Sequence, residues 1–549
     1  MRKVFSLLRI WEKTLLIAFT ILIAGSLYWN WQIFFLHHTV PTPGSGGNIN
    51  EGIIGQPHLL NPILAVSSTD QTLVHALFSG LYRYDEDGQL IPDLAVSLPS
   101  IGADGKHYTV KLQPNLSWHD GKPVTADDIL FTVSEIQNNT VQSPLRTLWL
   151  ATSVQKIDAL TVVFATKDTS GPFVHNLTLP LLPEHVWKNI PAENFSSNAL
   201  NMKPLGNGPF AIKQIENNPD GTVKRMVLAS FANYPRKPHL DTLTIVFYPN
   251  ADGLRQGYIA KEFQNFGIAT NDNLDIPENT STTQLHIALP QYQALFLNTA
   301  NPKLADVAVR QALRLAIDSA HVTETAWPTK ADSIYNPPLG LRTSSEAIPK
   351  GDVEAAEILL DKAGWTKKAN GIRSKGKISL DLHIVTSDAP SFINAGQLIA
   401  NTLQSIGVGA TITSVQINDL IRDFVRPRQY DALLFSERVG ADPDPFAFWH
   451  SSQVKDPGLN VSNFTSSEVD ALITNARTTT STKERQDLYA KLQDILKTAV
   501  PAIYLNQSNY TYIIDNSLQG VIMSNLPDPT WRLSFSPEWY VRTARAWKN

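Results

Sequence analysis

An uncharged apolar segment near the N-terminus is the first pattern in the chain. Residues 14–36 contain no charged side chain, and a helix of this length spans about 34 Å, slightly more than the roughly 30 Å hydrocarbon core of a bilayer. Basic residues precede the segment, and Tyr28, Trp29 and Trp31 lie towards its far end, where aromatic rings favour the membrane interface. We therefore predict a cytoplasmic basic stub over 1–13, a transmembrane anchor over 14–36 and an extracytoplasmic remainder.

Cleavage of this segment as a signal peptide is the alternative, with an apolar region over residues 15–24. No convincing small-residue cleavage site follows that region, and the apolar run continues beyond Gly25. Residues 37–49 then read HHTVPTPGSGGNI, which is rich in Pro, Gly and Ser. This composition predicts a flexible linker between the anchor and the exported part.

Short strand-like segments and turns dominate residues 50–290. Residues 108–112 alternate polar and apolar side chains, while residues 243–248 are more continuously apolar, and both patterns predict strands. Thr125 stands three residues before an aspartate, which is the spacing of a helix start. The inward face of that helix would carry Ile129, Val133 and Ile136.

From about residue 292 the pattern changes to helices that alternate with strands. Predicted helices cover residues 306–318, 352–363 and 483–498, and side chains from Ile378 to Ile384 alternate with the period of a strand. The first of these helices would bury Val309, Leu313 and Ala316, and it would expose Arg310 and Arg314 in i,i+4 pairs with Asp306 and Asp318. Alternation of strands and helices predicts α/β lobes.

Composition narrows the class of protein. The 549 residues include 43% hydrophobic and 17% charged side chains, which excludes a disordered chain. With 46 basic and 50 acidic residues the net charge is −4, so we expect no basic surface for nucleic acid. The absence of cysteine excludes disulfides, thiol catalysis, cysteine-ligated metals and thioether-linked lipid. We predict no cofactor and no metal site.

Catalytic motifs are scarce. The sequence has no GxSxG elbow, HExxH, GxGxxG or Walker A loop. Ser452 and Lys455 match SxxK, but no SDN or KTG partner accompanies them, and the WHDGK turn around His119 has the composition of a structural hairpin. Asp442 and Asp444 would suit a loop that presents carboxylates to a cationic ligand group better than a glycosidase pair. No catalytic residue is therefore predicted.

Several ordered motifs resemble those of the family 5 extracytoplasmic solute-binding proteins, the oligopeptide, dipeptide and nickel receptors of ABC importers. The segment 108–129, YTVKLQPNLSWHDGKPVTADDI, is similar to the family signature L-R-x-G-x-x-F-H-D-G-x-P-x-T-A-x-D-V, and VRQALRLAID within 297–318 is highly typical of the family. The other similar segments are 51–62, 77–81, 92–95, 204–210, 352–365, 430–448 and 469–505. Because the motifs occur in family order, the chain is identified as a member of this family.

The resemblance implies a two-lobed α/β fold of the periplasmic-binding-protein type (type II), in its large three-subdomain form, behind the N-terminal transmembrane helix. Lobe one would comprise residues 50–290 and 505–549, with an extra subdomain at about 86–189, and lobe two would comprise residues 291–504. Ligands of such proteins bind between the lobes, and hinge closure encloses them.

The same resemblance indicates which residues contact the ligand. In peptide-binding members, an aspartate in a loop after a strand pairs with the α-ammonium group of the peptide, and the family's W-G-A-D pattern aligns this aspartate with Asp442. Arg438 and Val439 stand near the expected tryptophan, which departs from the pattern, so Asp444 is an alternative and Asp442 would then only cap the loop. The predicted ligand-binding residues are Asp442, Asp444, Phe446, Trp449 and Tyr234.

The predicted function is a membrane-anchored receptor, not an enzyme, that captures an oligopeptide or a similar solute and delivers it to an ABC importer. Its partners would be the solute, the permease and ATPase subunits, and the lipid bilayer around residues 14–36, without nucleic acid. Two alternatives remain open: a sensor or chaperone with the same fold, and a hydrolase that uses Ser452 and Lys455 or the paired aspartates.

Overall fold

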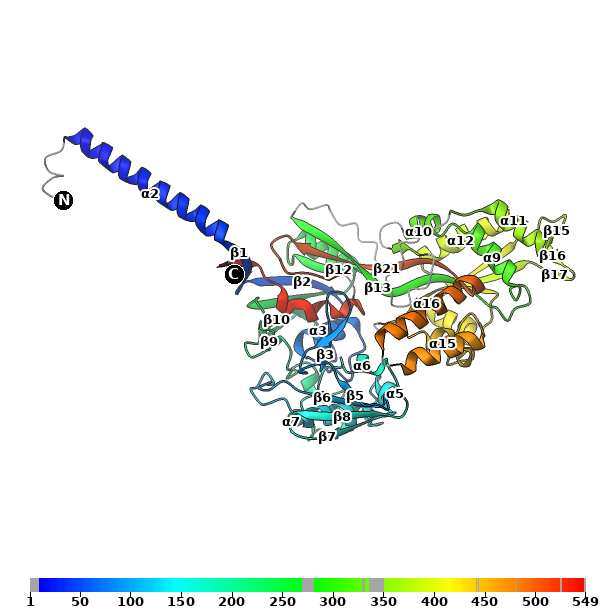
Figure 1. The fold of residues 1–549 in the computed structure, drawn as a ribbon, viewed down its shortest axis with the longest axis horizontal. Helices are drawn as coiled ribbons and strands as arrows, with labels where there is room; N and C mark the ends of the chain where they lie inside the picture. The colour runs from blue at the N-terminus through cyan, green and yellow to red at the C-terminus, as the bar shows by residue number, and fades with distance from the viewer. Residues whose placement is uncertain are drawn as a thin grey trace.

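Two lobes share one sheet, and a single helix projects from the first of them (Figure 1). The computed structural model describes residues 9–268, 281–327, 331–334, 350–440, 442, 444–479, 481–523 and 526–547. Within these residues an 11-stranded sheet has the order β19-β18-β20-β13-β21-β12-β2-β11-β10-β9, and β14 pairs with β21. The predicted two-lobed α/β fold is confirmed.

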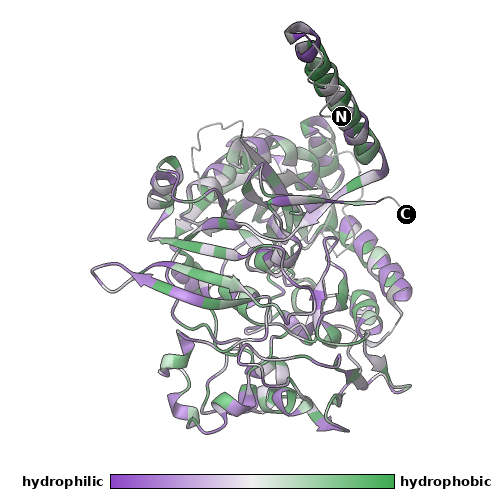
Figure 2. Ribbon diagram, turned by 90° about the vertical axis from the view of Figure 1, so that its left-hand side faces the viewer, coloured by the Kyte–Doolittle hydropathy of each residue, from purple (hydrophilic) through white to green (hydrophobic). Residues whose placement is uncertain are grey.

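Helix α2 (Ile10–His38) is the projecting element, and Figure 2 shows hydrophobic residues along much of its length. It is long and apolar enough to cross a membrane from Trp11 to His38, and the described part of the chain does not bury its most apolar stretch. The helix contains the predicted anchor over 14–36 and extends beyond it at both ends. A membrane anchor and a signal sequence both fit such a helix.

Residues 37–49 differ from the predicted flexible linker. Strand β1 (Thr39–Gly44) starts directly after α2 and pairs antiparallel with β22 (Arg542–Trp547), and strand β2 starts at Asn48. Local composition does not reveal this pairing because the partner strand is remote in sequence: Thr39 and Arg545, which are hydrogen-bonded, are 506 positions apart.

Lobe one is built on the half of the sheet that contains β2. This strand pairs parallel with β11 on one side and with β12 on the other, while β10 lies antiparallel between β11 and β9. The elements are β2 (Asn48–Ile54), α3 (Ser68–Leu77), β9 (Phe210–Asn217), β10 (Val223–Ser230), β11 (Thr242–Tyr248), α8 (Ala251–Ile259), β12 (Asn265–Ile268) and the 3-10 helix η5 (Pro529–Glu538).

A smaller four-stranded sheet, in the order β5-β6-β8-β7, extends lobe one and lies below it in Figure 1. Its elements are β5 (Ser100–Ile101), β6 (His107–Lys111), α4 (Ala126–Gln137), α5 (Arg146–Trp149), β7 (Thr152–Lys156), β8 (Thr161–Thr166), α6 (Phe173–Asn176) and α7 (Glu184–Trp187). The strand pair β3 (Tyr82–Tyr84) and β4 (Leu90–Pro92) and the short helices η1 (Ala192–Asn194) and η2 (Ala199–Asn201) complete this region.

Lobe two places helices around the other half of the large sheet, where β18 pairs parallel with both β19 and β20. Its helices are α9 (Val307–Ala316), α10 (Ser319–Ala326), α11 (Val353–Lys362), α12 (Pro390–Ser405), α13 (Ile417–Asp419), the π-helical η3 (Leu420–Val425), α14 (Phe446–Trp449), η4 (Ser451–Gln453), α15 (Ser467–Thr478) and α16 (Thr482–Ala499). Its strands are β14 (Ala331–Ser333), β15 (Thr366–Lys367), β16 (Arg373–Lys375), β17 (Ile378–Ser379), β18 (Asp381–Ser387), β19 (Gly409–Val415) and β20 (Ala432–Arg438).

Strands β13 (Thr282–Leu297) and β21 (Ala502–Asp515) run side by side through both lobes (Figure 1). Their register shifts between Ala288 and Tyr292, where the pairing passes from one lobe to the other. The hydrophobic cores are separate on the two sides, because Ile287 packs into the core of lobe one and Leu295 into a core of lobe two. The two strands are therefore the place where the lobes join.

The prediction that Arg310 is exposed on the outer face of α9 is wrong. The side chain is only 5% exposed and does not point outward towards Asp306. It donates hydrogen bonds to the carbonyl oxygens of Leu304, Ala305 and Ala499, at 2.7, 2.9 and 2.8 Å. Burial lowers the pKa of Arg310 below its ordinary value, although Asp306 opposes this effect. The Ala499 carbonyl at the end of α16 attracts the guanidinium, and a helical period within α9 cannot indicate this contact.

The strand predicted from Ile378 to Ile384 is interrupted. Leu380, Leu382 and Ile384 are buried as expected, but Ile378 lies in the separate strand β17, pairs with β16 and is 39% exposed. The helix start at Thr125 is confirmed, since Thr125 and Asp128 form a capping box at the start of α4.

Candidate functional site between the lobes

Asp442 lies in the loop between β20 and α14 and contacts groups from both lobes. Its Oδ2 atom is 3.1 Å from Nη1 of Arg485, on α16 of the same lobe, and 3.5 Å from Nε2 of His175, on α6 of lobe one. Only 8% of the Asp442 side chain is exposed. The predicted carboxylate is therefore enclosed at the interface between the lobes, where both lobes would meet a ligand.

Asp444 lies beside Asp442 and pairs with a second arginine. Its Oδ2 atom is 3.0 Å from Nε of Arg477, at the end of α15, and its Oδ1 atom accepts a hydrogen bond of 3.1 Å from the Phe446 amide. The Arg477 guanidinium also lies 4.2 Å from the centre of the Phe446 ring, within range of a cation–π contact. Asp444 thus helps to hold the start of α14.

The carboxylates of Asp442 and Asp444 and the guanidinium groups of Arg477 and Arg485 form one charged cluster. Their formal charges cancel, so the cluster is close to neutral. Desolvation lowers the pKa of His175 below its ordinary value, although the Asp442 carboxylate opposes the shift, so this imidazole is neutral at pH 7. Tyr84 Oη is 2.9 Å from the other ring nitrogen of His175, Nδ1. Burial raises the pKa of Asp444, and Arg477 offsets part of that rise.

Buried polar atoms in the cluster lack partners within the described part of the chain. They are Oδ1 of Asp442, Nε of Arg485 and the hydroxyl of Tyr489, which interacts electrostatically with both; Nε of Arg477 also lacks a hydrogen bond, although it forms the ion pair with Asp444. A buried polar group without a hydrogen bond is costly, and native proteins rarely retain one unless another molecule satisfies it. Here a carboxylate oxygen and two potential donors occur together, so the cluster suits a ligand that offers both donors and acceptors.

Other contacts between the lobes surround this cluster. The Gly171 amide of lobe one donates a 2.8 Å hydrogen bond to the carbonyl of Arg477. Nη1 of Arg438, at the end of β20, lies 2.8 Å from Oδ2 of Asp528, just before η5. The two lobes thus touch through polar groups on loops and helix ends.

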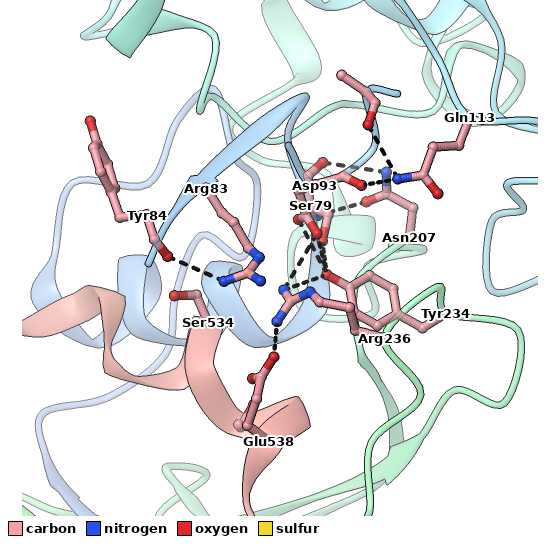
Figure 3. Close-up of polar contacts among 12 residues, drawn as sticks. Ser79, Arg83, Tyr84, Asp93, Gln113, Asn207, Tyr234, Arg236, Ser534 and Glu538 are labelled. Carbon is pink, nitrogen blue, oxygen red and sulfur yellow. Dashed lines mark hydrogen bonds and ion pairs between the residues drawn. The ribbon is translucent and has the colours of Figure 1, made fainter. Parts of the chain in front are cut away.

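Tyr234 is the centre of a separate polar network in lobe one (Figure 3). Its hydroxyl is 2.9 Å from Oγ of Ser79 and 3.0 Å from Oδ1 of Asp93, and it accepts a 3.0 Å hydrogen bond from Nη2 of Arg236. Arg236 also pairs with Glu538 at 2.7 Å, so in Figure 3 its guanidinium lies between these groups. Burial opposes the charge on Arg236, but Asp93 raises its pKa above the ordinary value.

A small pocket, partly open to solvent, adjoins this network, and every residue that lines it belongs to lobe one. Tyr234 therefore does not join Asp442, and its three partners already satisfy its hydroxyl. Trp449 is also apart from the charged cluster, because it is 2% exposed in the core of lobe two with Val469 and Ile473. The structure groups Asp442, Asp444 and Phe446; ligand contact by all five predicted residues remains a prediction.

His175, Arg477, Arg485 and Tyr489 belong to the cluster but were missing from the sequence-based set. Arg477 and Arg485 lie at the facing ends of α15 and α16, where a helical pattern treats charged residues as exposed. Only the Asp-Pro-Asp loop offered a signal, and nothing in the sequence indicates which helix ends lie against it.

The contacts around Ser452 do not form a serine–histidine–aspartate relay, and a hydrolase that uses Ser452 with Lys455 or the paired aspartates stays a prediction. Oγ of Ser452 is 2.9 Å from Nδ1 of His450, and the Asp470 carboxylate lies 3.9 Å from the same nitrogen. A serine–histidine–aspartate relay requires the serine and the aspartate on different ring nitrogens. His119 has a structural role, since its two ring nitrogens lie 3.3 Å from the Gly206 amide and 3.1 Å from the Gly208 carbonyl.

A molecule with two α/β lobes, joined by paired strands and with charged groups meeting between the lobes, has the architecture of a solute-binding protein. The family model described as bacterial extracellular solute-binding proteins, family 5 Middle, matches residues 89–458. The chain therefore belongs to this family, whose members are substrate-binding proteins of ABC transporters rather than enzymes.

Known proteins similar to this chain include the oligopeptide-binding protein AppA of Bacillus subtilis, with 26% identity over 491 residues, 87% of this chain and 89% of AppA. The structure of AppA in complex with a nonapeptide has a TM-score of 0.66 at 24% identity and covers 91% of this chain and all of that one (100%). The ABC transporter substrate-binding protein CtaP of Listeria monocytogenes has a TM-score of 0.75 at 24% identity, with 90% and 99% coverage. NikZ of Campylobacter jejuni, in complex with Ni(L-His), has a TM-score of 0.67 at 24% identity and the same coverage.

Proposed function

We propose that this protein is the solute-capturing subunit of an ABC importer, that α2 holds it at the outer face of the membrane, and that its solute is a peptide. The solute would bind between the lobes, and bending where β13 and β21 cross would close the lobes around it. The permease and ATPase subunits of the importer would be its partners.

The charged cluster around Asp442 is the observation that carries this proposal. Among the described residues it combines a carboxylate oxygen without a hydrogen-bond partner, buried donors without such partners, and contributions from both lobes. A peptide supplies an ammonium group at its N-terminus and alternating donors and acceptors along its backbone. We assign Asp442 Oδ1 to the α-ammonium group, and Arg485 and Tyr489 to carbonyl oxygens near the same end.

The comparisons support a peptide as the solute class. AppA is an oligopeptide-binding protein, and its solved complex holds a nonapeptide. NikZ holds a nickel–histidine complex, so the ligands of similar proteins extend beyond peptides. In the described residues no group of three or more His, Asp or Glu side chains could hold a metal ion. We therefore favour the peptide.

Peptide pairs that differ only at the N-terminus test the assignment. Native mass spectrometry of the full-length protein in detergent would first identify the peptides that copurify. Calorimetry would then compare one such peptide with its N-acetylated form, on the wild type and on Asp442→Asn. We expect acetylation and Asp442→Asn each to weaken binding by roughly 2–5 kcal/mol, because each removes one partner of the proposed ion pair between the ammonium group and Asp442.

The coupling between the two changes is the decisive quantity. If the ammonium meets Asp442, Asp442→Asn has little further effect on the acetylated peptide. Asp444→Asn is the matched control, because Asp444 pairs with Arg477 and helps to hold α14, and it should not distinguish the two peptides. Equal losses for both peptides in Asp442→Asn would remove the assignment, and absence of any bound peptide would remove the solute class.

A further inference from the structure

The β1–β22 ribbon, defined as residues 39–44 and 542–547, lies at the base of the membrane helix (Figures 1 and 2). We propose that this ribbon is a membrane-contact surface that holds lobe one against the lipid headgroups of an anionic bilayer. The inference rests on the proposed anchoring by α2 and specifies how the exported part is held.

Arg545 locks the ribbon to the end of α2. Its Nη2 atom donates hydrogen bonds to the carbonyl oxygens of Leu36 and Thr39, at 3.1 and 3.0 Å, and its Nε atom donates to Oγ1 of Thr39 at 2.8 Å. Carbonyl groups in the last turn of a helix have no partner within the helix, and a cation there also complements the helix dipole. No loop separates α2 from β1, so helix and ribbon form one connected unit.

Trp547 lies at the end of the membrane helix, a position typical of an aromatic ring at the membrane–water interface. Its ring centre is 6.2 Å from that of Phe34 and 5.8 Å from that of Phe35, both in the last turns of α2, and the side chain is still 59% exposed. The helical rise from Leu15 to Leu36 is about 33 Å, enough to fill the hydrocarbon core. Residues just beyond Leu36, together with Trp547, then fall at the level of the headgroups.

The composition of the ribbon suits an anionic lipid surface. All six residues of β22 are exposed, Arg542 and Arg545 are among them, and neither strand contains an acidic residue. A two-stranded sheet without a covering layer is only marginally stable in water. A lipid surface would cover it, and anionic headgroups would attract the two arginines.

The other end of the ribbon is fastened to lobe one. The Gly46 amide donates to the carbonyl of His239 at 2.6 Å, and the Gly47 amide donates to Oδ2 of Asp241 at 3.1 Å. Gly47 has φ +105°, and a Cβ atom there would lie 2.1 Å from the Val541 side chain, so glycine permits this close approach. Lobe one is thus fixed to the anchor through bonded backbone, and closure would move lobe two relative to the bilayer.

Fluorophores on single introduced cysteines test whether the ribbon contacts the membrane. Each label reports on one position, because the sequence contains no cysteine. The full-length protein would be placed in nanodiscs of equal parts phosphatidylcholine and phosphatidylglycerol that contain a headgroup-attached quencher. A fluorophore on Ala546→Cys should lose most of its emission to the quencher. The same fluorophore on Ile393→Cys, an exposed position on α12 of lobe two, should keep its emission.

Pairing within the ribbon is tested by disulfides in the same nanodiscs. Thr42 and Ala544 face each other in register, so Thr42→Cys with Ala544→Cys should crosslink, whereas Thr42→Cys with Ala546→Cys should not. Arg542→Ala should weaken quenching at residue 546 in the anionic nanodiscs and bring it closer to the level in phosphatidylcholine alone, while Arg545, which holds the ribbon to α2, stays in place.

Failure of this inference is distinguishable from failure of the proposed function. Intact mass of the purified protein reports whether α2 is retained, and calorimetry on the same sample reports peptide binding. If α2 is retained and the label at residue 546 is quenched no more than the label at residue 393, the ribbon does not contact the membrane. The proposed binding of peptides is unaffected by that result. If α2 is removed in the mature protein, both membrane anchoring by α2 and membrane contact by the ribbon are refuted.

Discussion

At the scale of single residues, Glu51 connects four elements of lobe one. The carboxylate is fully buried, accepts a 2.7 Å hydrogen bond from Nε of Arg532 on η5, and accepts a second of 2.8 Å from the Tyr512 hydroxyl on β21. Arg532 in turn donates to Oγ1 of Thr72 on α3 at 3.1 Å. The pair therefore ties the first strand of the large sheet to the last helix of the chain.

Glu51→Gln should destabilise the protein by roughly 3–5 kcal/mol, because it leaves the buried Arg532 guanidinium without its counter-charge. The midpoint of chemical denaturation of the full-length protein in detergent measures the loss. Glu216→Gln is the matched control, since Glu216 pairs with Arg225 on the surface and should change stability by less than about 1 kcal/mol. Similar midpoints for the two variants would contradict this account of Glu51.

At the scale of elements, strands β13 and β20 bring a second buried carboxylate opposite a tyrosine. Tyr292 and Glu437 face each other in the ladder and are hydrogen-bonded through their side chains. Burial raises the pKa of Glu437 to about 8, and the hydrogen bond from Tyr292 lowers it only in part. Glu437 is therefore protonated at pH 7, which strand alternation could not reveal because it assigns each residue to a face but not to a protonation state.

The Glu437 carboxyl should make stability fall as pH rises. The folded protein binds this proton more tightly than the unfolded chain, whose ordinary pKa is 4.5, so the contribution is complete below pH 4.5 and is lost up to about pH 8. Glu437→Gln, which stays neutral, should reduce this slope and be more stable than the wild type above pH 8. Thermal denaturation across this pH range measures how stability depends on pH. Glu468 is exposed on α15, so Glu468→Gln should leave this dependence unchanged.

At the scale of the whole molecule, the described residues include polar contacts between the lobes, while each lobe keeps its own core. Arg438 of β20 and Asp528 before η5 form one such contact, and Arg438 is 62% exposed. An exposed ion pair contributes at most about 1 kcal/mol, which corresponds to about a fivefold change in a two-state equilibrium. Such a contact can bias the lobes without locking them.

Arg438→Ala should therefore raise the open fraction of the ligand-free protein by up to about fivefold. Small-angle X-ray scattering of the full-length protein in nanodiscs would show a larger radius of gyration, and saturating peptide should restore the wild-type value. Arg422→Ala removes an exposed arginine that pairs with Asp419 and Asp423 of its own lobe, and it should leave the radius unchanged. Equal radii for the two variants would mean that the contact does not bias closure.

The sequence by itself determined the parts of this protein that depend on near neighbours along the chain. The apolar run of α2, the capping box at Thr125, the buried face of α9 and the ordered family motifs all follow from local spacing, and they led to the two-lobed fold and to the Asp442 loop. The tertiary structure decided what depends on remote partners. Pairing of Thr39 with a strand 506 positions away, burial of Arg310 against the end of α16, and the meeting of His175 with Asp442 are contacts across the fold. Hydrophobic periods indicate which side of an element is buried, but they contain no information about which other element covers it.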